Sequence, residues 1–253
     1  MSNLKQAIKQ NYLKCAKDPS HFINEFCVIQ HPQRGKIKFK LYPYQFDVLK
    51  EYQENDYNVV LKSRQLGIST LSAAYSLWMM LFHADKNILC IATSKDTAKN
   101  LVTKVRVMYE GLPQWLKTAI VENNKLSLIF KNGSQIKAIA SNESAGRSEA
   151  LSLLILDEAA FIDKIDTIWT AAQQTLATGG QCLAISTPNG VGNWFHKTWI
   201  DASDGVNKFN TIKLHWSQHP ERDESWRKEQ DKILGPSKAA QECDADFLSS
   251  GRS

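Results

Sequence analysis

The stretch that most constrains the fold runs from Leu61 to Thr70 and reads Leu-Lys-Ser-Arg-Gln-Leu-Gly-Ile-Ser-Thr. An apolar segment, Tyr57 to Leu61, precedes it, and a segment rich in Ala, Leu, Trp and Met, Leu71 to Phe82, follows it. These patterns predict a strand, a loop and a helix in that order, which is the arrangement of a phosphate-binding loop. A serine- and glycine-containing turn before a core helix is the simpler alternative.

The loop departs from the standard pattern G-x-x-x-x-G-K-[ST] at two positions. Lys62 stands where the first glycine is expected and Ile68 where the lysine is expected, whereas Gly67 and Ser69 keep their places. A triphosphate needs a cation near its β- and γ-phosphates and a hydroxyl on Mg²⁺. Ser69 supplies the hydroxyl, and Lys62 and Arg64 are the candidate cations. In a chain without Lys62, Ile68→Lys is expected to restore part of the standard arrangement.

A second apolar run ends in two acidic residues. Residues 151–156 read Leu-Ser-Leu-Leu-Ile-Leu, and Asp157 and Glu158 follow them. Such a run is typical of a central parallel strand that is covered on both faces. Hydrolysis of a nucleoside triphosphate needs one carboxylate on Mg²⁺ and another beside the attacking water. We expect Asp157 to take the first role and Glu158 the second; an Asp-Glu helix cap is the alternative.

Together these stretches resemble the large terminase subunits of tailed phages, which are ATPases that pump DNA into capsids. Residues 63–67 are similar to the family's S-R-Q-x-G loop, and some members carry the loop lysine at the front, as Lys62 does here. Residues 154–159 resemble the family's Walker B strand, residues 186–190 its coupling motif, and residues 244–248 the end of its ATPase domain. The resemblance covers about residues 40 to 250.

The alternation of strand-like and helix-like segments predicts an α/β fold. We expect a P-loop NTPase of the RecA-like, ASCE type, with a parallel sheet sandwiched by helices and an extra strand between the P-loop strand and the Walker B strand. Asn132-Gly133 between two strand-like runs predicts a hairpin. The expected elements are strands at 87–93, 126–130, 135–140, 181–186 and 209–214, and helices at 95–111, 166–176, 193–202 and 224–234.

Three further site residues are assigned by position. Gln45, in a helix that begins at 42–45, can read both edges of adenine, as the glutamine of terminases does. Arg147 resembles the finger that terminases are proposed to supply across a subunit interface. Ser186 and Thr187 end a strand where ligands bind in open sheets, and resemble a γ-phosphate sensor. A surface glutamine, a surface arginine and a plain β-turn are the respective alternatives.

The site therefore comprises a nucleotide-binding set, two Mg²⁺ ligands (Ser69 and Asp157) and three catalytic residues (Glu158, Arg147 and Arg64). The nucleotide-binding set is Gln45, Lys62, Ser63, Arg64, Gln65, Leu66, Gly67, Ile68, Ser69 and Thr70. The basic residues of the helix at 95–111, Lys95, Lys99, Lys104 and Arg106, are typical of a solvated face.

The N-terminal segment, residues 1–41, is expected to form a helical lid or brace. Two amphipathic helices occupy residues 4–30 and are separated at Asp18-Pro19-Ser20, with Ser20 as the N-cap of the second. A turn at 31–35 and a strand over 36–41 follow. We expect residues 42–248 to form the ATPase core and residues 249–253 to be a linker toward an absent nuclease domain, so DNA cleavage is not assigned.

Composition is that of an ordinary globular protein. The 253 residues are 43% hydrophobic and 23% charged, and the net charge of +5 is compatible with a nucleic-acid partner. The longest apolar helix is too short to span a bilayer, and the N-terminus lacks an apolar signal core. An odd number of cysteines without C-x-x-C spacing indicates a reducing compartment and neither a disulfide framework nor a zinc site. They are Cys15, Cys27, Cys90, Cys182 and Cys243.

The resemblance implies a motor domain that uses ATP and Mg²⁺ to drive double-stranded DNA into a procapsid. It implies a homo-oligomeric ring, expected to be a pentamer, on a portal protein, together with a small terminase subunit and no membrane, in the host cytoplasm. A helicase-like DNA-dependent ATPase is disfavoured because too little chain follows Gly190 for a second motor domain. A non-hydrolysing nucleotide-sensing or DNA-scaffolding module is the third possibility, and Ile68 in the lysine position is its best support.

Overall fold

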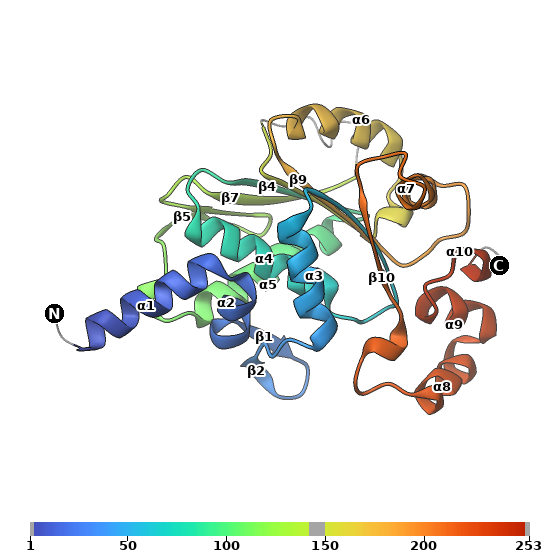
Figure 1. Ribbon diagram of the computed structural model, residues 1–253, viewed down its shortest axis with the longest axis horizontal. Coiled ribbons are helices and arrows are strands. Elements are labelled where there is room, and N and C mark those ends of the chain that lie inside the picture. Colours follow the sequence, from blue (N-terminus) through green and yellow to red (C-terminus); the bar gives the residue numbers. More distant parts are fainter. Residues whose placement is uncertain (1–2, 142–149, 251–253) are drawn as a thin grey trace.

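A mainly parallel sheet of eight strands forms the centre of the protein (Figure 1). The computed structural model describes residues 3–141 and 150–250. Within them the strand order is β10-β3-β9-β8-β4-β7-β6-β5. The parallel strands are β10 (Asn210–Leu214), β3 (Tyr57–Lys62), β9 (Gln181–Ser186), β8 (Leu153–Asp157), β4 (Asn87–Ala92) and β7 (Gln135–Ala140). The antiparallel strands are β6 (Ser127–Phe130) and β5 (Ile120–Asn123).

The predicted extra strand is β9, which lies between the P-loop strand β3 and the Walker B strand β8. Leu61 of β3 is opposite Ser186 of β9, and Ile185 of β9 is opposite Asp157 of β8. The three strands therefore end at the same edge of the sheet. Ligands of open α/β sheets bind at this carboxyl edge, so the fold brings the predicted site residues to one place.

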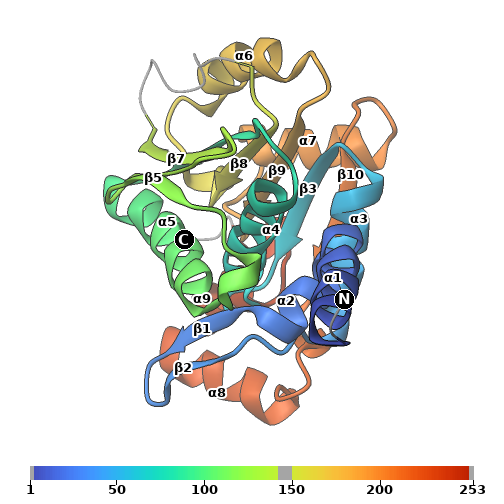
Figure 2. The same cartoon turned by 90° about the vertical axis from the view of Figure 1, so that its left-hand side faces the viewer.

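Alternating side chains bury both faces of the central strands, as their continuous apolar sequences predict. In β8, Leu153 and Ile155 face one helical layer, whereas Leu154 and Leu156 face the other. The first layer includes α3 (Pro43–Glu54), α4 (Ile68–Phe82) and α5 (Lys95–Gly111), and the second includes α6 (Ile165–Leu176) and α7 (Trp194–Ser203). Figure 2 shows these two layers on opposite faces of the sheet.

The N-terminal helices α1 (Asn3–Lys17) and α2 (Pro19–Phe26) pack against α4. Trp78 Nε1 donates a hydrogen bond to the Cys15 carbonyl at 2.8 Å. The N-cap of α2 is Asp18 rather than the predicted Ser20, because Pro19 occupies the first helical turn and the cap must precede it. Residues 28–30, predicted as helix, instead belong to a hairpin of β1 (Val28–His31) and β2 (Gly35–Lys38).

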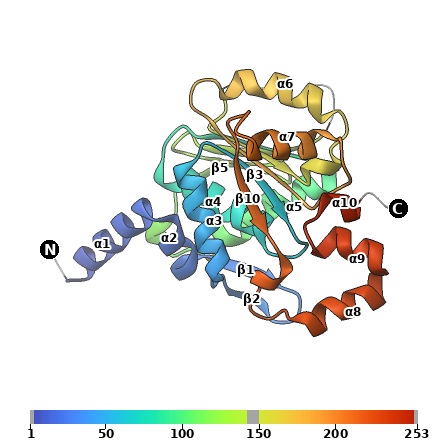
Figure 3. The same cartoon turned by 45° about the vertical axis from the view of Figure 1, so that its right-hand side comes forward.

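The chain after β10 forms helices beside the carboxyl edge of the sheet, on the other side of the molecule from α1 (Figure 3). They are η3 (Trp216–Gln218), α8 (Glu224–Leu234), α9 (Pro236–Cys243) and α10 (Phe247–Ser250). The sequence patterns missed α9, since Gly235-Pro236 marks the end of α8 and also begins the next helix, with proline in its first turn. Arg227 Nε and Nη2 bind both carboxylate oxygens of Asp244, at 2.7 and 2.8 Å, and thereby fix this segment.

The predicted hairpin at Asn132-Gly133 is confirmed as β6–β7, whereas the outer strand β5 was not predicted. All five cysteines are buried free thiols. Among residues 3–141 and 150–250 there is no helix with the length and apolar character needed to cross a bilayer.

Candidate active site

The segment between β3 and α4, residues 63–67, forms the predicted loop. Gln65 and Gly67 both adopt left-handed backbone conformations, with φ of 58° and 73°. Gly67 is required there, because a Cβ atom would also lie 2.8 Å from Nε2 of Gln45. Left-handed residues within a loop turn neighbouring N–H groups toward a common anion, which is how such loops hold phosphate.

Ser69 and Asp157 meet at the end of this loop. The Ser69 hydroxyl, in the first turn of α4, donates a hydrogen bond of 2.9 Å to Oδ1 of Asp157, at the end of β8. Burial raises the pKa of the Asp157 carboxyl, and the neighbouring Glu158 charge raises it further, while the Ser69 hydrogen bond and Lys62 oppose the shift. The carboxyl group is thus held where a cation would stabilise its ionised form.

The donor set fits Mg²⁺, which prefers oxygen ligands and is usually bound by one or two carboxylates together with substrate phosphates. Ser69 and Asp157 supply a hydroxyl and a carboxylate. In the part of the chain that the structure describes, no group of three or more His, Cys, Asp or Glu side chains suits a metal ion. A Mg²⁺ site completed by phosphate oxygens does not require such a group.

Lys62 and Glu158 form an ion pair in the same place. The Lys62 ammonium lies 3.1 Å from Oε1 of Glu158, and the two side chains are 6% and 33% exposed. Glu158 has a left-handed backbone, with φ of 54°, which is unfavourable for a residue with a Cβ atom and is often found at functional sites. The expected phosphate cation and the expected water-activating carboxylate therefore neutralise each other.

Ile68 points into the core and not toward the loop cavity. It begins α4 and is 1% exposed, within the hydrophobic cluster that joins α4 to the sheet. A lysine at this position would place its stem among core side chains, so the expectation that Ile68→Lys restores a phosphate cation does not fit the geometry. The cation must come from another position, and Lys62 is the buried lysine at the end of the P-loop strand.

Arg64 is exposed and is held by α9. Its guanidinium lies 3.6 Å from a carboxylate oxygen of Glu242, and its backbone N–H donates to the Glu242 carbonyl at 2.6 Å. The preceding Ser63 hydroxyl donates to the carbonyl oxygens of Leu214 and Cys243. Sequence reasoning did not connect α9 with the loop, because no motif marks Glu242.

Gln45 lies against the loop, but backbone groups occupy its amide. Oε1 accepts from the Tyr42 N–H at 3.0 Å and Nε2 donates to the Leu66 carbonyl at 3.2 Å. A cavity of about 480 Å³ opens here, and its lining includes Tyr42, Tyr44, Gln45, Gln65, Thr70 and His219. Aromatic side chains with a few polar groups suit a nucleobase. Adenine recognition by Gln45 stays a prediction, and it requires Gln45 to exchange at least one of these hydrogen bonds.

The end of β9 is joined to the residues that follow Glu158. The Ser186 hydroxyl accepts a hydrogen bond from the Ala160 N–H at 3.1 Å, and Asn189 Nδ2 donates to the Ala160 carbonyl at 3.1 Å. Ser186 and Thr187 are buried. A movement of Glu158 would therefore be felt at the loop after β9, although a sensor role for Ser186 and Thr187 stays a prediction.

Two basic residues stand differently from the prediction. Lys104 of α5 was assigned to a solvated face, but its charge lowers the pKa of Asp157 against the larger effect of burial. Helical spacing offers the missed signal, because Lys104 is on the opposite side of α5 from Lys95. Arg147 lies outside the described residues, so its role stays a prediction.

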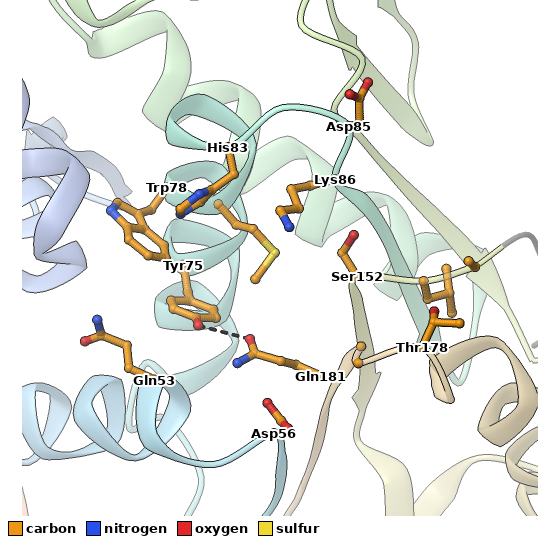
Figure 4. Close-up of a pocket in the computed structure, with 15 residues that line it drawn as sticks. Gln53, Asp56, Tyr75, Trp78, His83, Asp85, Lys86, Ser152, Thr178 and Gln181 are labelled. Carbon is orange, nitrogen blue, oxygen red and sulfur yellow. Dashed lines mark hydrogen bonds between the residues drawn. The ribbon is translucent and has the colours of Figure 1, made fainter.

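Another cavity, of about 530 Å³, lies at the opposite edge of the sheet (Figure 4). Its lining comes from the amino ends of the central strands and from α4, where Tyr75 donates to Gln181 Oε1 at 3.0 Å. The Lys86 ammonium points into it. None of the predicted site residues lines it, and amino ends are not where open α/β sheets bind nucleotides.

The inserted strand, the loop and the two acidic residues after β8 together define a P-loop NTPase of the ASCE type. Residues 59–253 match the family described as terminase large subunit, T4likevirus-type, N-terminal. The chain belongs to this family.

Solved structures share the fold. The Thermus phage P74-26 large terminase ATPase domain matches with a TM-score of 0.66 and 22% identity, over 83% of this chain and 95% of that one. The HK97 bacteriophage large terminase matches with a TM-score of 0.72 and 19% identity, over 93% of this chain and 55% of that one. A large terminase of a thermophilic bacteriophage, in complex with ADP, matches with a TM-score of 0.65 and 13% identity, over 82% and 53%. This chain thus spans about half the length of the last two proteins.

Proposed function

We propose that this chain hydrolyses ATP and that hydrolysis drives double-stranded DNA into a viral procapsid. The observation that carries the proposal is the convergence of two pairs from separate strands, Ser69 with Asp157 at 2.9 Å and Lys62 with Glu158 at 3.1 Å. Family membership supports it, as do terminases of the same fold in complex with ADP and with ATP-gamma-S.

Each residue then has a distinct task. Ser69 and Asp157 hold Mg²⁺, which when bound offsets the charge of the β- and γ-phosphates. Lys62 exchanges its contact with Glu158 for a phosphate oxygen. The Glu158 carboxylate, released from Lys62, orients the attacking water and accepts its proton.

Other predicted residues assist from the margin of the site. Arg64 leaves Glu242 to neutralise the γ-phosphate, and Arg147 acts on the phosphate of a neighbouring subunit. Ser186 and Thr187 transmit the change through Ala160 to the loop after β9. These assignments extend the ion-pair exchange at Glu158 to the rest of the carboxyl edge.

The proposed partners follow from the family. They are double-stranded DNA, a homo-oligomeric ring of five copies on a portal protein, and a small terminase subunit, in the host cytoplasm. The net charge of +5 is compatible with DNA. The residues 1–41 segment is proposed as a lid or brace and residues 42–248 as the motor core.

Steady-state phosphate release tests the function. We expect wild-type protein to hydrolyse ATP faster with double-stranded DNA, and Glu158→Gln to be inactive under the same conditions. Stronger stimulation by single-stranded or forked DNA would favour the helicase alternative. Nucleotide binding without hydrolysis, at any DNA concentration, would favour the nucleotide-sensing or DNA-scaffolding module.

A further inference from the structure

Side chains from outside the loop hold the carbonyl oxygens of three consecutive loop residues. Arg222 donates through Nη1 to the Arg64 carbonyl at 3.0 Å and through Nη2 to the Gln65 carbonyl at 2.9 Å. The next carbonyl, that of Leu66, accepts from the Tyr44 hydroxyl at 2.8 Å and from Gln45. Because each peptide plane has its C=O and N–H on opposite sides, fixing the carbonyls outward turns the N–H groups of these planes inward.

Arg222 is well suited to this contact and is itself oriented. A guanidinium presents its N–H groups in a rigid planar fork, so one side chain can bind two adjacent carbonyls. The Arg222 guanidinium lies over the Trp226 ring, 4.4 Å from its centroid, and Trp226 packs against Trp216 at 5.9 Å. Burial lowers the pKa of Arg222, but an arginine stays charged under all physiological conditions.

The backbone at Gln65 explains why the loop needs such a partner. Its left-handed conformation, with φ of 58°, is unfavourable for a residue other than glycine and persists only when the surroundings fix it. Without Arg222, the carbonyls of Arg64 and Gln65 would be free to turn toward water. The loop would then have to be ordered by the nucleotide itself, and ordering costs binding free energy.

We propose that Arg222 is a positioning residue for the nucleotide: it holds the front half of the phosphate loop in its binding conformation without touching the phosphates. This inference rests on the proposed function, because it takes the loop to be the ATP site. It makes the segment between η3 and α8 a part of the nucleotide site. The rival interpretation is a strut that stabilises the fold and has no effect on the nucleotide.

The test compares Arg222→Lys and Arg222→Ala with Arg227→Ala. Arg227 is a matched control, because it lies nearby on α8 and binds Asp231 and Asp244 but no loop residue. The measurements are the Kd of a fluorescent ATP analogue with Mg²⁺, kcat and KM for ATP, and Tm without nucleotide. We expect both Arg222 variants to weaken nucleotide binding by about tenfold, the scale of one hydrogen bond to a charged group. Arg227→Ala should lower Tm and leave Kd unchanged.

The outcomes separate the proposal from its rival. An unchanged Kd in Arg222→Lys and in Arg222→Ala would overturn it, and so would a loss of affinity in Arg227→Ala as large as that in Arg222→Ala. If Arg222→Ala does not fold, Arg222→Lys decides, since lysine keeps the charge but lacks the fork. If wild-type protein binds the analogue but does not hydrolyse ATP, the proposed function fails, whereas the Kd comparison still decides the role of Arg222.

Discussion

The ammonium of Lys62 lies 3.1 Å from the carboxylate of Glu158, although β9 separates the strands that carry the two residues. Lys62 is almost fully buried, and a buried charge without a partner is strongly destabilising. Glu158 therefore serves as its counter-ion when no phosphate is bound. In this arrangement the arrival of a phosphate and the release of the carboxylate are a single exchange.

Glu158→Gln should abolish hydrolysis while retaining ATP binding. The amide cannot accept a proton from water, but the loop, Ser69 and Asp157 are untouched, and Lys62 is freed for phosphate. Steady-state phosphate release and the Kd of a fluorescent ATP analogue measure the two effects. Asp163→Asn, an exposed change close by in the sequence, is the control. Hydrolysis by Glu158→Gln at nearly the wild-type rate would show that the catalytic assignment is wrong.

Lys62→Ala should lower ATP turnover by more than about tenfold, the scale of a lost charge-assisted contact in a transition state. It also leaves Glu158 without its ion-pair partner. Lys213→Ala is the matched control, because Lys213 lies opposite Leu61 on β10 and its side chain is exposed. Equal turnover in the two variants would rule out Lys62 as the phosphate cation and leave Arg64 as the candidate.

Ile68→Lys should destabilise the protein and should not rescue Lys62→Ala. Ile68 is 1% exposed, so a lysine must bury its charge or displace its neighbours, at a cost of more than about 2 kcal/mol. Ile68→Val, with an expected loss of only about 0.5–1.5 kcal/mol, is the control. Denaturant unfolding measures both. A fully stable Ile68→Lys chain with restored hydrolysis would contradict the placement of this side chain.

Asp157→Asn should raise Tm in the absence of nucleotide and Mg²⁺. Burial raises the pKa of Asp157 above its unfolded value, so the folded state holds this proton to higher pH. Folding stability therefore falls as pH rises from the ordinary carboxyl pKa through the raised one, and the loss persists at neutral pH. The amide oxygen still accepts from Ser69 and removes this loss, with about 2–4 °C gained per 1 kcal/mol in a chain of this size.

The same variant should lose stabilisation by Mg²⁺ with ATP. Thermal scans of wild type and Asp157→Asn at neutral pH and near pH 4, with and without the ligands, test both effects. A wild-type Tm advantage at neutral pH without ligands would contradict the prediction.

Mixing Arg147→Ala with Glu158→Gln should restore some hydrolysis. Each variant lacks a group that the other supplies, if Arg147 acts on the phosphate of a neighbouring subunit. Arg147→Ala alone should bind nucleotide normally. No recovery at any mixing ratio, under conditions where wild-type chains associate, would count against action across an interface.

The strand order and the catalytic pairs were accessible from sequence because they depend on local patterns. The apolar run before Asp157 predicts a strand buried on both faces, and the run before Lys62 predicts a second one. Parallel strands that share a sheet bring their carboxyl ends together, so the meeting of Ser69 with Asp157 follows from topology.

The contacts of the loop backbone were not accessible in this way. Arg222 and Glu242 reach the loop from segments far along the chain, and no spacing rule relates them to residues 63–67. The burial of Ile68 was missed because a motif fixes a position in the loop but not the direction of its side chain. Gly235-Pro236 concealed α9, since the same dipeptide ends one helix and begins another.

Strands β3, β9 and β8 each have a neighbouring strand on both sides, and their faces are covered by helices. Backbone amides in such strands exchange with heavy water only when large parts of a domain open. Lys62, Asp157 and Glu158 stand at the ends of these strands, whereas Arg222 and Glu242 belong to the marginal segment after β10. Nucleotide should therefore leave the slow exchange of the central strands unchanged and slow the exchange of residues 63–67 and of the segment that grips them.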